Sequence, residues 1–229
     1  INQPETGTGS DSSLLASFSV PPESTPTWTR AFGSGSMLGG VAASSEGVYG
    51  AGTSYSLTTD SVGDKERKAI VAKFALDGAN GSGPEGTIWV AGSGGTSTRT
   101  SLFSYGGGED YKAALLIMES GSPVLYAAGG GQPCSYASYL VAKFDANGNR
   151  LAAATDSTVG IQFSQCFIPS EGGSDAHALA LAGGNLVVAG STSWNHEGDW
   201  PVPGSRPALW FYSPSLTLVP PISTPIATR

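Results

Sequence analysis

Short apolar runs recur along the chain and are separated by clusters of glycine, serine, aspartate and asparagine. The run VAKF at 71–74 returns at 141–144, and looser copies stand at 15–18 (LASF) and 209–212 (LWFY). The aromatic residues that close these runs lie roughly 60 to 70 residues apart, and such self-similarity marks proteins built from stacked units. Runs this short, bounded by turn residues, predict β-strands.

Each unit contains further predicted strands in a constant order. A turn such as Asp145-Ala146-Asn147-Gly148 follows the aromatic run, which we term strand D, and these residue types are typical of hairpin turns. The strand beyond the turn, strand A, is predicted at 27–30, 88–91, 151–154 and 216–219. Tight hairpins of strands B and C are predicted at 41–52, 114–129 and 178–190. No amphipathic helix of useful length is predicted.

This order predicts an all-β fold, a β-propeller-like repeat of four-stranded antiparallel blades, with about three complete blades plus flanking strands. We expect a single domain over 1–229, with repeats at 27–85, 86–148 and 149–212 and stray strands at 13–20 and 216–220. The segment 88–92 also matches strand C. We assign it to strand A because that assignment keeps the order constant in all repeats.

The repeated motifs also resemble those of a known family. The segments 48–52, 125–129 and 186–190 approach Val-Tyr-Val-Ala-Gly, and 71–78 and 141–148 approach Val-Ala-Lys-Phe-Asp-x-Asn-Gly. In these motifs the chain resembles bacterial β-propeller repeats of the SBBP type. The resemblance implies a propeller in a secreted or cell-surface setting. The fourth copy departs from the motif, because Ser213-Pro214-Ser215 stands where the others have an Asp-x-Asn turn.

The predicted strand order leaves open edges at both ends, since it begins on strand D and ends on strand A. Three blades are too few to close a ring, because typical propellers have roughly four to eight. Either the stray strands help to build a fourth blade, or a partner completes the structure. That partner would be another copy, the rest of a larger precursor, or a filament of subunits that exchange strands. Open edges favour such association through main-chain hydrogen bonds.

Charge and composition narrow the range of partners. The net charge is −7 and only 13% of residues are charged, which argues against nucleic acid and anionic lipid as partners. The one dense charge run, at 64–68, has mixed signs and predicts a solvated loop. No apolar stretch approaches the length of about 18 residues expected of a spanning helix, so we expect no membrane insertion. The N-terminus lacks signal-peptide features, and a secreted protein would be in its mature form.

The long predicted loops gather on one face of the propeller, and loops on one face often bind ligands. They are 53–68, 93–112, 130–138, 159–176 and 191–207. Cys134 and Cys166 lie in two of these loops in neighbouring blades, so we expect a disulfide between them, with two free buried thiols as the alternative. Asn80 begins an Asn-Gly-Ser glycosylation sequon in a predicted turn.

One long loop is rich in candidate binding residues, which are Trp194, Asn195, His196, Glu197, Asp199 and Trp200. Two tryptophan rings beside polar groups are suited to a sugar, because a sugar offers apolar ring faces and hydroxyls. The alternative is that the rings pack the loop onto its blade while the polar groups face water, and of the two we favour packing.

Signatures of catalysis and metal binding are missing from the sequence. It contains no nucleophile elbow, P-loop, dinucleotide fingerprint or His-Glu-x-x-His motif. His177 and His196 lie in different segments, and His177 is expected to be structural. The carboxylates at 109–110 and at Glu197 and Asp199 supply no spacing that indicates acid–base chemistry. We therefore assign no catalytic residue, cofactor or metal.

The sequence favours a non-catalytic, structural or adhesive module that is extracellular or on the cell surface. It would contact other proteins through its open edges or its long-loop face. A lectin-like, carbohydrate-binding propeller centred on Trp194 and Trp200 is the alternative. A polysaccharide hydrolase or lyase is a third and less favoured hypothesis.

Overall fold

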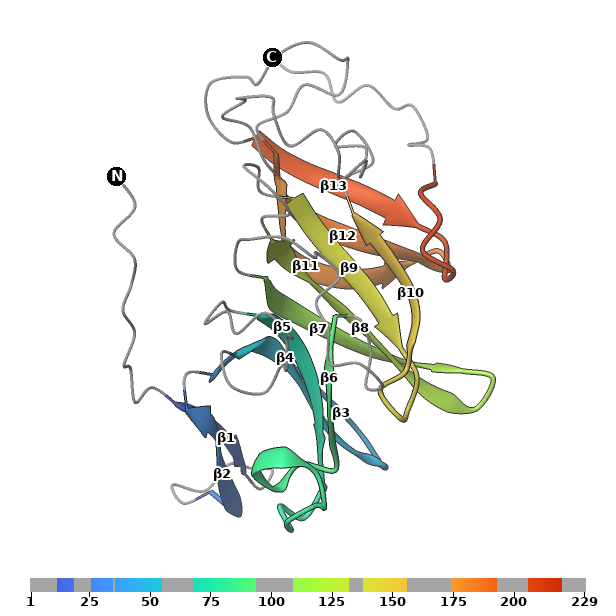
Figure 1. The fold of residues 1–229 in the computed structure, drawn as a ribbon. Coiled ribbons are helices and arrows are strands. Elements are labelled where there is room, and N and C mark those ends of the chain that lie inside the picture. Colours follow the sequence, from blue (N-terminus) through green and yellow to red (C-terminus); the bar gives the residue numbers. More distant parts are fainter. Residues whose placement is uncertain are drawn as a thin grey trace, which may run out of the picture.

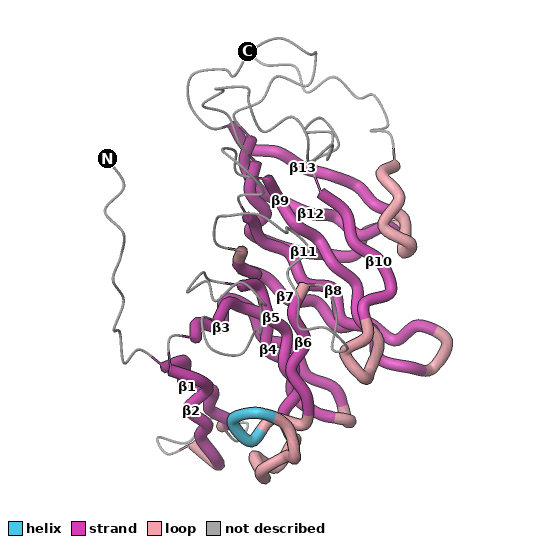
Figure 2. The backbone as a smooth tube through the Cα atoms, in the orientation of Figure 1, coloured by secondary structure: helices cyan, strands magenta, loops and turns pink. Residues whose placement is uncertain are grey.

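Most of the described residues lie in β-strands in the computed structural model (Figures 1 and 2). The structure describes residues 12–18, 26–34, 36–54, 68–93, 109–131, 138–155, 174–192 and 206–219. The only helical segment among them is the 3-10 turn η1, Pro84–Gly86. No helix in this part of the chain is long and apolar enough to cross a membrane.

The strands form four separate sheets, which we number in chain order. Sheet 1 contains β1 (Ser12–Ser17) and β2 (Trp28–Ser34). Sheet 2 contains β3 (Ser36–Ser44), β4 (Gly47–Ser54), β5 (Lys68–Phe74) and β6 (Trp89–Gly92). Sheet 3 contains β7 (Asp110–Glu119), β8 (Ser122–Gly131), β9 (Ser138–Phe144) and β10 (Arg150–Thr155). Sheet 4 contains β11 (Ser174–Ala182), β12 (Asn185–Thr192) and β13 (Arg206–Tyr212).

All strand pairs are antiparallel, and neighbours in each sheet follow chain order. The structure thus confirms an all-β fold with four-stranded antiparallel sheets. Strand β6 pairs with β5, which confirms the assignment of 88–92 to strand A. Sheets 2 and 3 run B-C-D-A, so the last strand of each comes from the start of the next sequence repeat, while the described part of sheet 1 holds D-A and that of sheet 4 holds B-C-D. No closed propeller is detected among the described strands.

Two-residue turns join strands B and C in sheets 2, 3 and 4. In sheet 3 the turn residues Ser120 and Gly121 have φ values of 50° and 84°, and in sheet 4 Gly183 and Gly184 have 57° and 79°. Positive φ at both positions matches the right-handed twist of the flanking strands, which is why such turns close tight hairpins.

The turn after strand D has the chemistry that the sequence predicts. In sheets 2 and 3 an aspartate side chain accepts a hydrogen bond from the backbone N–H two residues on, at 2.9 Å in both cases. Gly78 and Gly148 then take positive φ. In the divergent fourth copy Leu216 takes this conformation, with φ of 59°, and its side chain is buried in the core. Burial of Leu216 offsets the strain that a side chain incurs there.

A β-bulge recurs in the first strand of sheets 2, 3 and 4. The extra residue is Gly39 in β3, Lys112 in β7 and His177 in β11. A glycine on the neighbouring strand faces each bulge, and a Cβ at Gly129 would lie 2.0 Å from the Asp110 carbonyl oxygen. The repeated glycine therefore permits the bulge, which redirects the side chain beside it.

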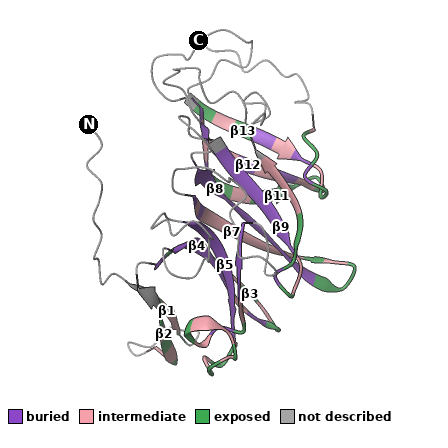
Figure 3. Cartoon of the chain, viewed as in Figure 1, coloured by how far each residue is buried: buried purple, intermediate pink, exposed green. Residues whose placement is uncertain are grey.

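The core lies between consecutive sheets, which are stacked in chain order (Figure 1). One cluster of buried side chains joins sheets 2 and 3, another joins sheets 3 and 4, and a smaller one joins sheets 1 and 2. Strands β4 and β8 are buried on both faces, as expected for sheets covered on both sides (Figure 3). The most extensive packing between sheets is that of β3 against β7, and at the next junction β11 packs against β8 and β7.

The terminal strands pair locally. Strand β1 pairs with β2, and Tyr212 at the end of β13 forms a bridge with Leu218. Within the described residues the two ends of the chain do not pair with each other. The long loops that the sequence predicts fall mainly outside the described residues.

Candidate functional site

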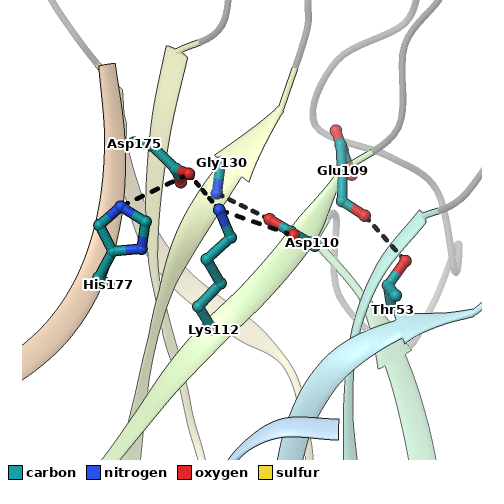
Figure 4. Close-up of polar contacts among 7 residues, drawn as sticks. All are labelled: Thr53, Glu109, Asp110, Lys112, Gly130, Asp175 and His177. Atoms are coloured by element: carbon teal, nitrogen blue, oxygen red, sulfur yellow. Dashed lines mark hydrogen bonds and ion pairs between the residues drawn. The ribbon is translucent and has the colours of Figure 1, made fainter. Parts of the chain in front are cut away.

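A polar cluster lies where β7 and β11 begin, at the end of the sheets from which the long loops leave (Figure 4). We call Asp110, Lys112, Asp175 and His177 the inner-strand cluster. Two of its members, Lys112 and His177, are the extra residues of their bulges. Each of them stands two positions after its strand's aspartate, so it lies on the same face of the strand as that aspartate.

Lys112 joins the two strands of the inner-strand cluster. Its Nζ donates a hydrogen bond to Asp175 Oδ2 and lies 3.9 Å from Asp110 Oδ2. His177 Nε2 lies 3.8 Å from Asp175 Oδ2, and the Gly130 N–H donates to Asp110 Oδ1 at 3.2 Å. One cation therefore faces two carboxylates from neighbouring sheets, which suits the cluster to hold sheets 3 and 4 together.

The inner-strand cluster is an ion pair that is partly open to solvent. Among the residues that the structure describes, no group of three or more His, Cys, Asp or Glu side chains is placed to hold an ion. Its side chains are partly exposed, and that of His177 is about half exposed. The Oδ1 atom of Asp175 is buried and has no hydrogen-bond partner, so the cluster holds one carboxylate oxygen that Lys112 does not satisfy.

A second polar contact joins sheets 2 and 3 close by (Figure 4). Glu109 is fully buried, its Oε2 accepts a hydrogen bond from Ser93 Oγ at 2.9 Å, and its carbonyl oxygen accepts one from Thr53 Oγ1 at 3.0 Å. Burial, and then the charge of Glu109, raises the pKa of Tyr111, while Arg150 opposes this shift. The Tyr111 phenol therefore stays protonated near neutral pH, and this arrangement is structural.

The opposite end of the sheets carries a cluster of Glu119, Tyr126 and Lys143, which we call the turn-end cluster. Lys143 Nζ lies 2.7 Å from Glu119 Oε2, and Tyr126 Oη lies 2.7 Å from Glu119 Oε1. Burial by itself raises the pKa of Glu119, but the hydrogen bonds from Lys143 and Tyr126 outweigh it and lower the pKa. Burial, followed by the Glu119 carboxylate, raises the pKa of Tyr126.

One hydrogen bond between sheets recurs along the stack. Trp28 Nε1 of sheet 1 donates to the Leu76 carbonyl oxygen of sheet 2 at 3.0 Å. Trp89 Nε1 of sheet 2 donates to the Ala146 carbonyl oxygen of sheet 3, also at 3.0 Å. Both acceptors lie two residues after the aromatic of strand D. Each junction therefore uses the same turn position.

At the third junction the acceptor is conserved in position while the donors change. The Pro214 carbonyl oxygen of sheet 4 lies 2.9 Å from both Lys143 Nζ and Tyr126 Oη of sheet 3. Ala152 pairs with Lys143 as Trp89 pairs with Lys73, so the two residues hold equivalent positions. Strand A of sheet 3 therefore has an alanine where sheets 1 and 2 have a tryptophan. The turn-end cluster thus replaces the tryptophan and keeps the contact between sheets.

The outer face of sheet 4 is apolar and open. We call Val187, Ala189, Leu209 and Phe211 the C-terminal face; Val187 pairs with Phe211 and Ala189 with Leu209, so all four point the same way. The opposite face of the same strands packs against sheet 3. Leu209 is 59% exposed, whereas Val141 at the equivalent position of sheet 3 is fully buried.

Sheet 1 has an open apolar face at the other end of the stack. Leu15 packs against sheet 2, so Leu14, Ala16 and Phe18 point away from it, and we call these three the N-terminal face. Leu14 is 69% exposed and Phe18 is 49% exposed. Each end of the described stack therefore presents large apolar side chains to solvent.

Several residues that the sequence singled out fall outside the described residues. They are the candidate disulfide Cys134 and Cys166 and the candidate glycan-binding Trp194, Asn195, His196, Glu197, Asp199 and Trp200, and both hypotheses stay predictions. Asn80 is exposed in the turn between β5 and β6, and its Oδ1 accepts a hydrogen bond from Arg30. Its glycosylation is likewise a prediction.

The sequence did not point to the inner-strand cluster or to the two open faces. Lys112 and Asp175 are far apart in the chain, and only the bulges and the stacking of sheets bring them together. An alignment of the strands D of all copies would identify the residues of the open faces. It would not show that they are exposed, because exposure depends on whether another sheet packs against them. No protein-family model matches the chain, and a search of curated proteins found no match either.

Proposed function

We propose that this protein is a non-catalytic structural or adhesive module, built from propeller-type blades and active outside the cell, that works through protein–protein association. The C-terminal face is the surface through which it associates. The observation that carries the proposal is that this face is apolar and only partly covered, with Leu209 exposed and the other three side chains half-buried, while the equivalent positions of sheets 2 and 3 are buried.

The composition of the C-terminal face supports a contact there. A sheet of a repeat protein that faces solvent carries a polar outer face, because it must stay soluble. Sheet 4 differs from sheet 3 in the opposite direction: Val187 stands at the position of Tyr126 and Phe211 at that of Lys143. Exposed apolar patches of this kind mark interaction sites.

The repeated contacts between sheets support a modular way of assembly. The same turn position accepts a hydrogen bond at three junctions, and the apolar positions that cover each junction are the same. A chain built this way is suited to accept one more unit at its end, as neighbouring repeats do within solenoids and propellers.

The test is the mass of the native particle by light scattering over a range of concentrations. The expected result is a particle larger than the 23.1 kDa chain that dissociates in the Leu209→Lys variant. Leu209 is exposed, so the substitution should leave the fold intact. Met118→Lys is the matched control, because Met118 is equally exposed and lies on neither face. A wild-type protein that stays monomeric at every concentration would contradict the proposal.

A further inference from the structure

We infer that the C-terminal face of one copy binds the N-terminal face of a second copy, so that the chain associates head to tail. This inference rests on the proposed function and adds the identity of the partner. It follows from a contact that the molecule already makes with itself between sheets 2 and 3.

The contact between sheets 2 and 3 has two halves. Sheet 2 contributes Tyr49, Ala51 and Val71 to a buried cluster. Sheet 3 contributes Leu140, Ala142 and Phe144 of strand β9 to the same cluster. All six side chains are fully buried. The first half lies on the face of sheet 2 that packs against the next sheet along the chain. The second half lies on the face of sheet 3 that packs against the sheet before it.

The N-terminal face repeats the second half residue for residue. Leu14, Ala16 and Phe18 are the same residue types, at the same spacing, as Leu140, Ala142 and Phe144. Both triplets lie along strand D, on the face of the sheet that is turned away from the following sheet. The triplet in sheet 3 is fully buried, whereas the large side chains of the triplet in sheet 1 are exposed.

The C-terminal face repeats the first half. Val187, Ala189 and Leu209 occupy the positions of Tyr49, Ala51 and Val71, as the register of the paired strands shows. The alanine is retained, and the other two positions remain apolar. The two open faces are thus the two halves of one interface, and they stand at opposite ends of the stack (Figures 1 and 3).

Such an interface is heterologous, because different surfaces of the two copies meet. Repetition of a heterologous contact closes a ring or extends into a filament. The described part of sheet 1 has strands only at positions D and A, and it lacks the first strand that makes most of the close contacts between sheets inside the molecule. The contact is therefore smaller than the internal ones, and we expect assembly to depend on concentration.

The experiment mixes two variants that each retain one face. Leu14→Lys disables the N-terminal face, Leu209→Lys disables the C-terminal face, and both residues are exposed in the single copy. Each variant alone should sediment as a monomer in analytical ultracentrifugation. An equimolar mixture should form a one-to-one dimer that grows no further, while the double variant should bind neither partner. Unchanged far-UV circular dichroism and thermal midpoints serve as the folding control.

The possible failures are distinguishable. If Leu209→Lys dissociates the particle while Leu14→Lys assembles like wild type, the head-to-tail inference is wrong and the proposed function stands, with another partner for the C-terminal face. The same holds if both variants are monomeric and their mixture remains monomeric. If the wild type is itself monomeric, or if Leu209→Lys assembles like wild type, both fail.

Discussion

Strands β8 and β12 hold the same place in consecutive sheets but differ in burial. Almost every residue of β8 is buried, whereas β12 alternates between buried and half-buried positions (Figure 3). Both are apolar second strands of tight hairpins, so the strand type does not explain the difference. The difference arises because sheet 4 follows β8 and no described sheet follows β12. Whether a strand of this fold is buried on both faces therefore depends on whether a further sheet packs against it, and not on its place in the repeat.

The outer face of sheet 4 also differs from that of sheet 3 in composition. The positions of Tyr126 and Lys143, which form polar contacts in sheet 3, hold Val187 and Phe211 in sheet 4. Burial of apolar side chains contributes roughly 25 cal/mol per Å² of area removed from water. Sheet 4 therefore retains the capacity to be stabilised by a further sheet.

The largest expected effect comes from equivalent aromatics in sheets 3 and 1. Phe144→Ala removes a fully buried ring between sheets 2 and 3 and should lower the free energy of unfolding by about 3–5 kcal/mol. Phe18→Ala removes the half-exposed ring at the same position of sheet 1 and should cost less than about 1 kcal/mol in dilute protein. Urea denaturation at low protein concentration measures both values, and equal losses would contradict the comparison.

A smaller effect is expected at the strands that come closest between sheets. A Cβ at Gly40 would lie 2.4 Å from the backbone nitrogen of Ala114 in the next sheet. Gly40→Ala should therefore lower the free energy of unfolding by about 1–3 kcal/mol through overpacking. The control is Ala178→Val, since Ala178 holds the equivalent position of the exposed outer face and should change stability by less than about 0.5 kcal/mol.

The strands and turns of this fold were predictable because their causes are local. Short apolar runs, glycine at positive φ and aspartate in the turn after strand D act over a few residues, and the structure confirms each of them. The grouping of strands into sheets was less accessible. Strand A pairs across a short turn with the preceding strand D, so sheets and sequence repeats differ by one strand.

The inner-strand cluster could not be predicted because it joins two sheets. The i and i+2 spacing places each aspartate on the same face as Lys112 or His177, but a bulge changes which face every following side chain occupies. The three bulge positions hold Gly39, Lys112 and His177, which share no residue type that would indicate the bulge. The pairing of Lys112 with Asp175 further requires that sheets 3 and 4 stack, which no short motif encodes.

The turn-end cluster predicts a pH effect confined to the junction of sheets 3 and 4. The pKa of Glu119 is lowered in the folded protein, so its ionised form stabilises the fold above its usual pKa of about 4.5 and this stabilisation is lost as the pH falls through the lowered pKa. Glu119→Gln should cost about 1 kcal/mol at pH 7 and less at pH 3, because the carboxylate is protonated in a growing fraction of molecules as the pH falls. Thermal unfolding at both pH values measures this.

The control for the pH effect is Glu46→Gln in sheet 2. Glu46 Oε2 lies 3.7 Å from Lys73 Nζ and its side chain is about half exposed, so this contact is longer and better solvated than that of Glu119. Its loss should change stability less at either pH. A Glu119→Gln variant whose deficit is the same at pH 3 and pH 7 would show that the carboxylate does not act through its charge.

The smallest effect is expected at the inner-strand cluster, where the two junctions differ most in chemistry. Sheets 2 and 3 approach through glycine backbone, whereas sheets 3 and 4 meet through Lys112 and Asp175. Both side chains are partly exposed, so Lys112→Met should cost less than about 1 kcal/mol, and less still in high salt, because solvent and ions screen the pair. A double-mutant cycle with Asp175→Asn isolates the pair from the packing of the lysine stem. A coupling energy that is zero at low salt would mean that this ion pair adds nothing to the junction of sheets 3 and 4, which then rests on its apolar contacts and on the hydrogen bonds to the Pro214 carbonyl oxygen.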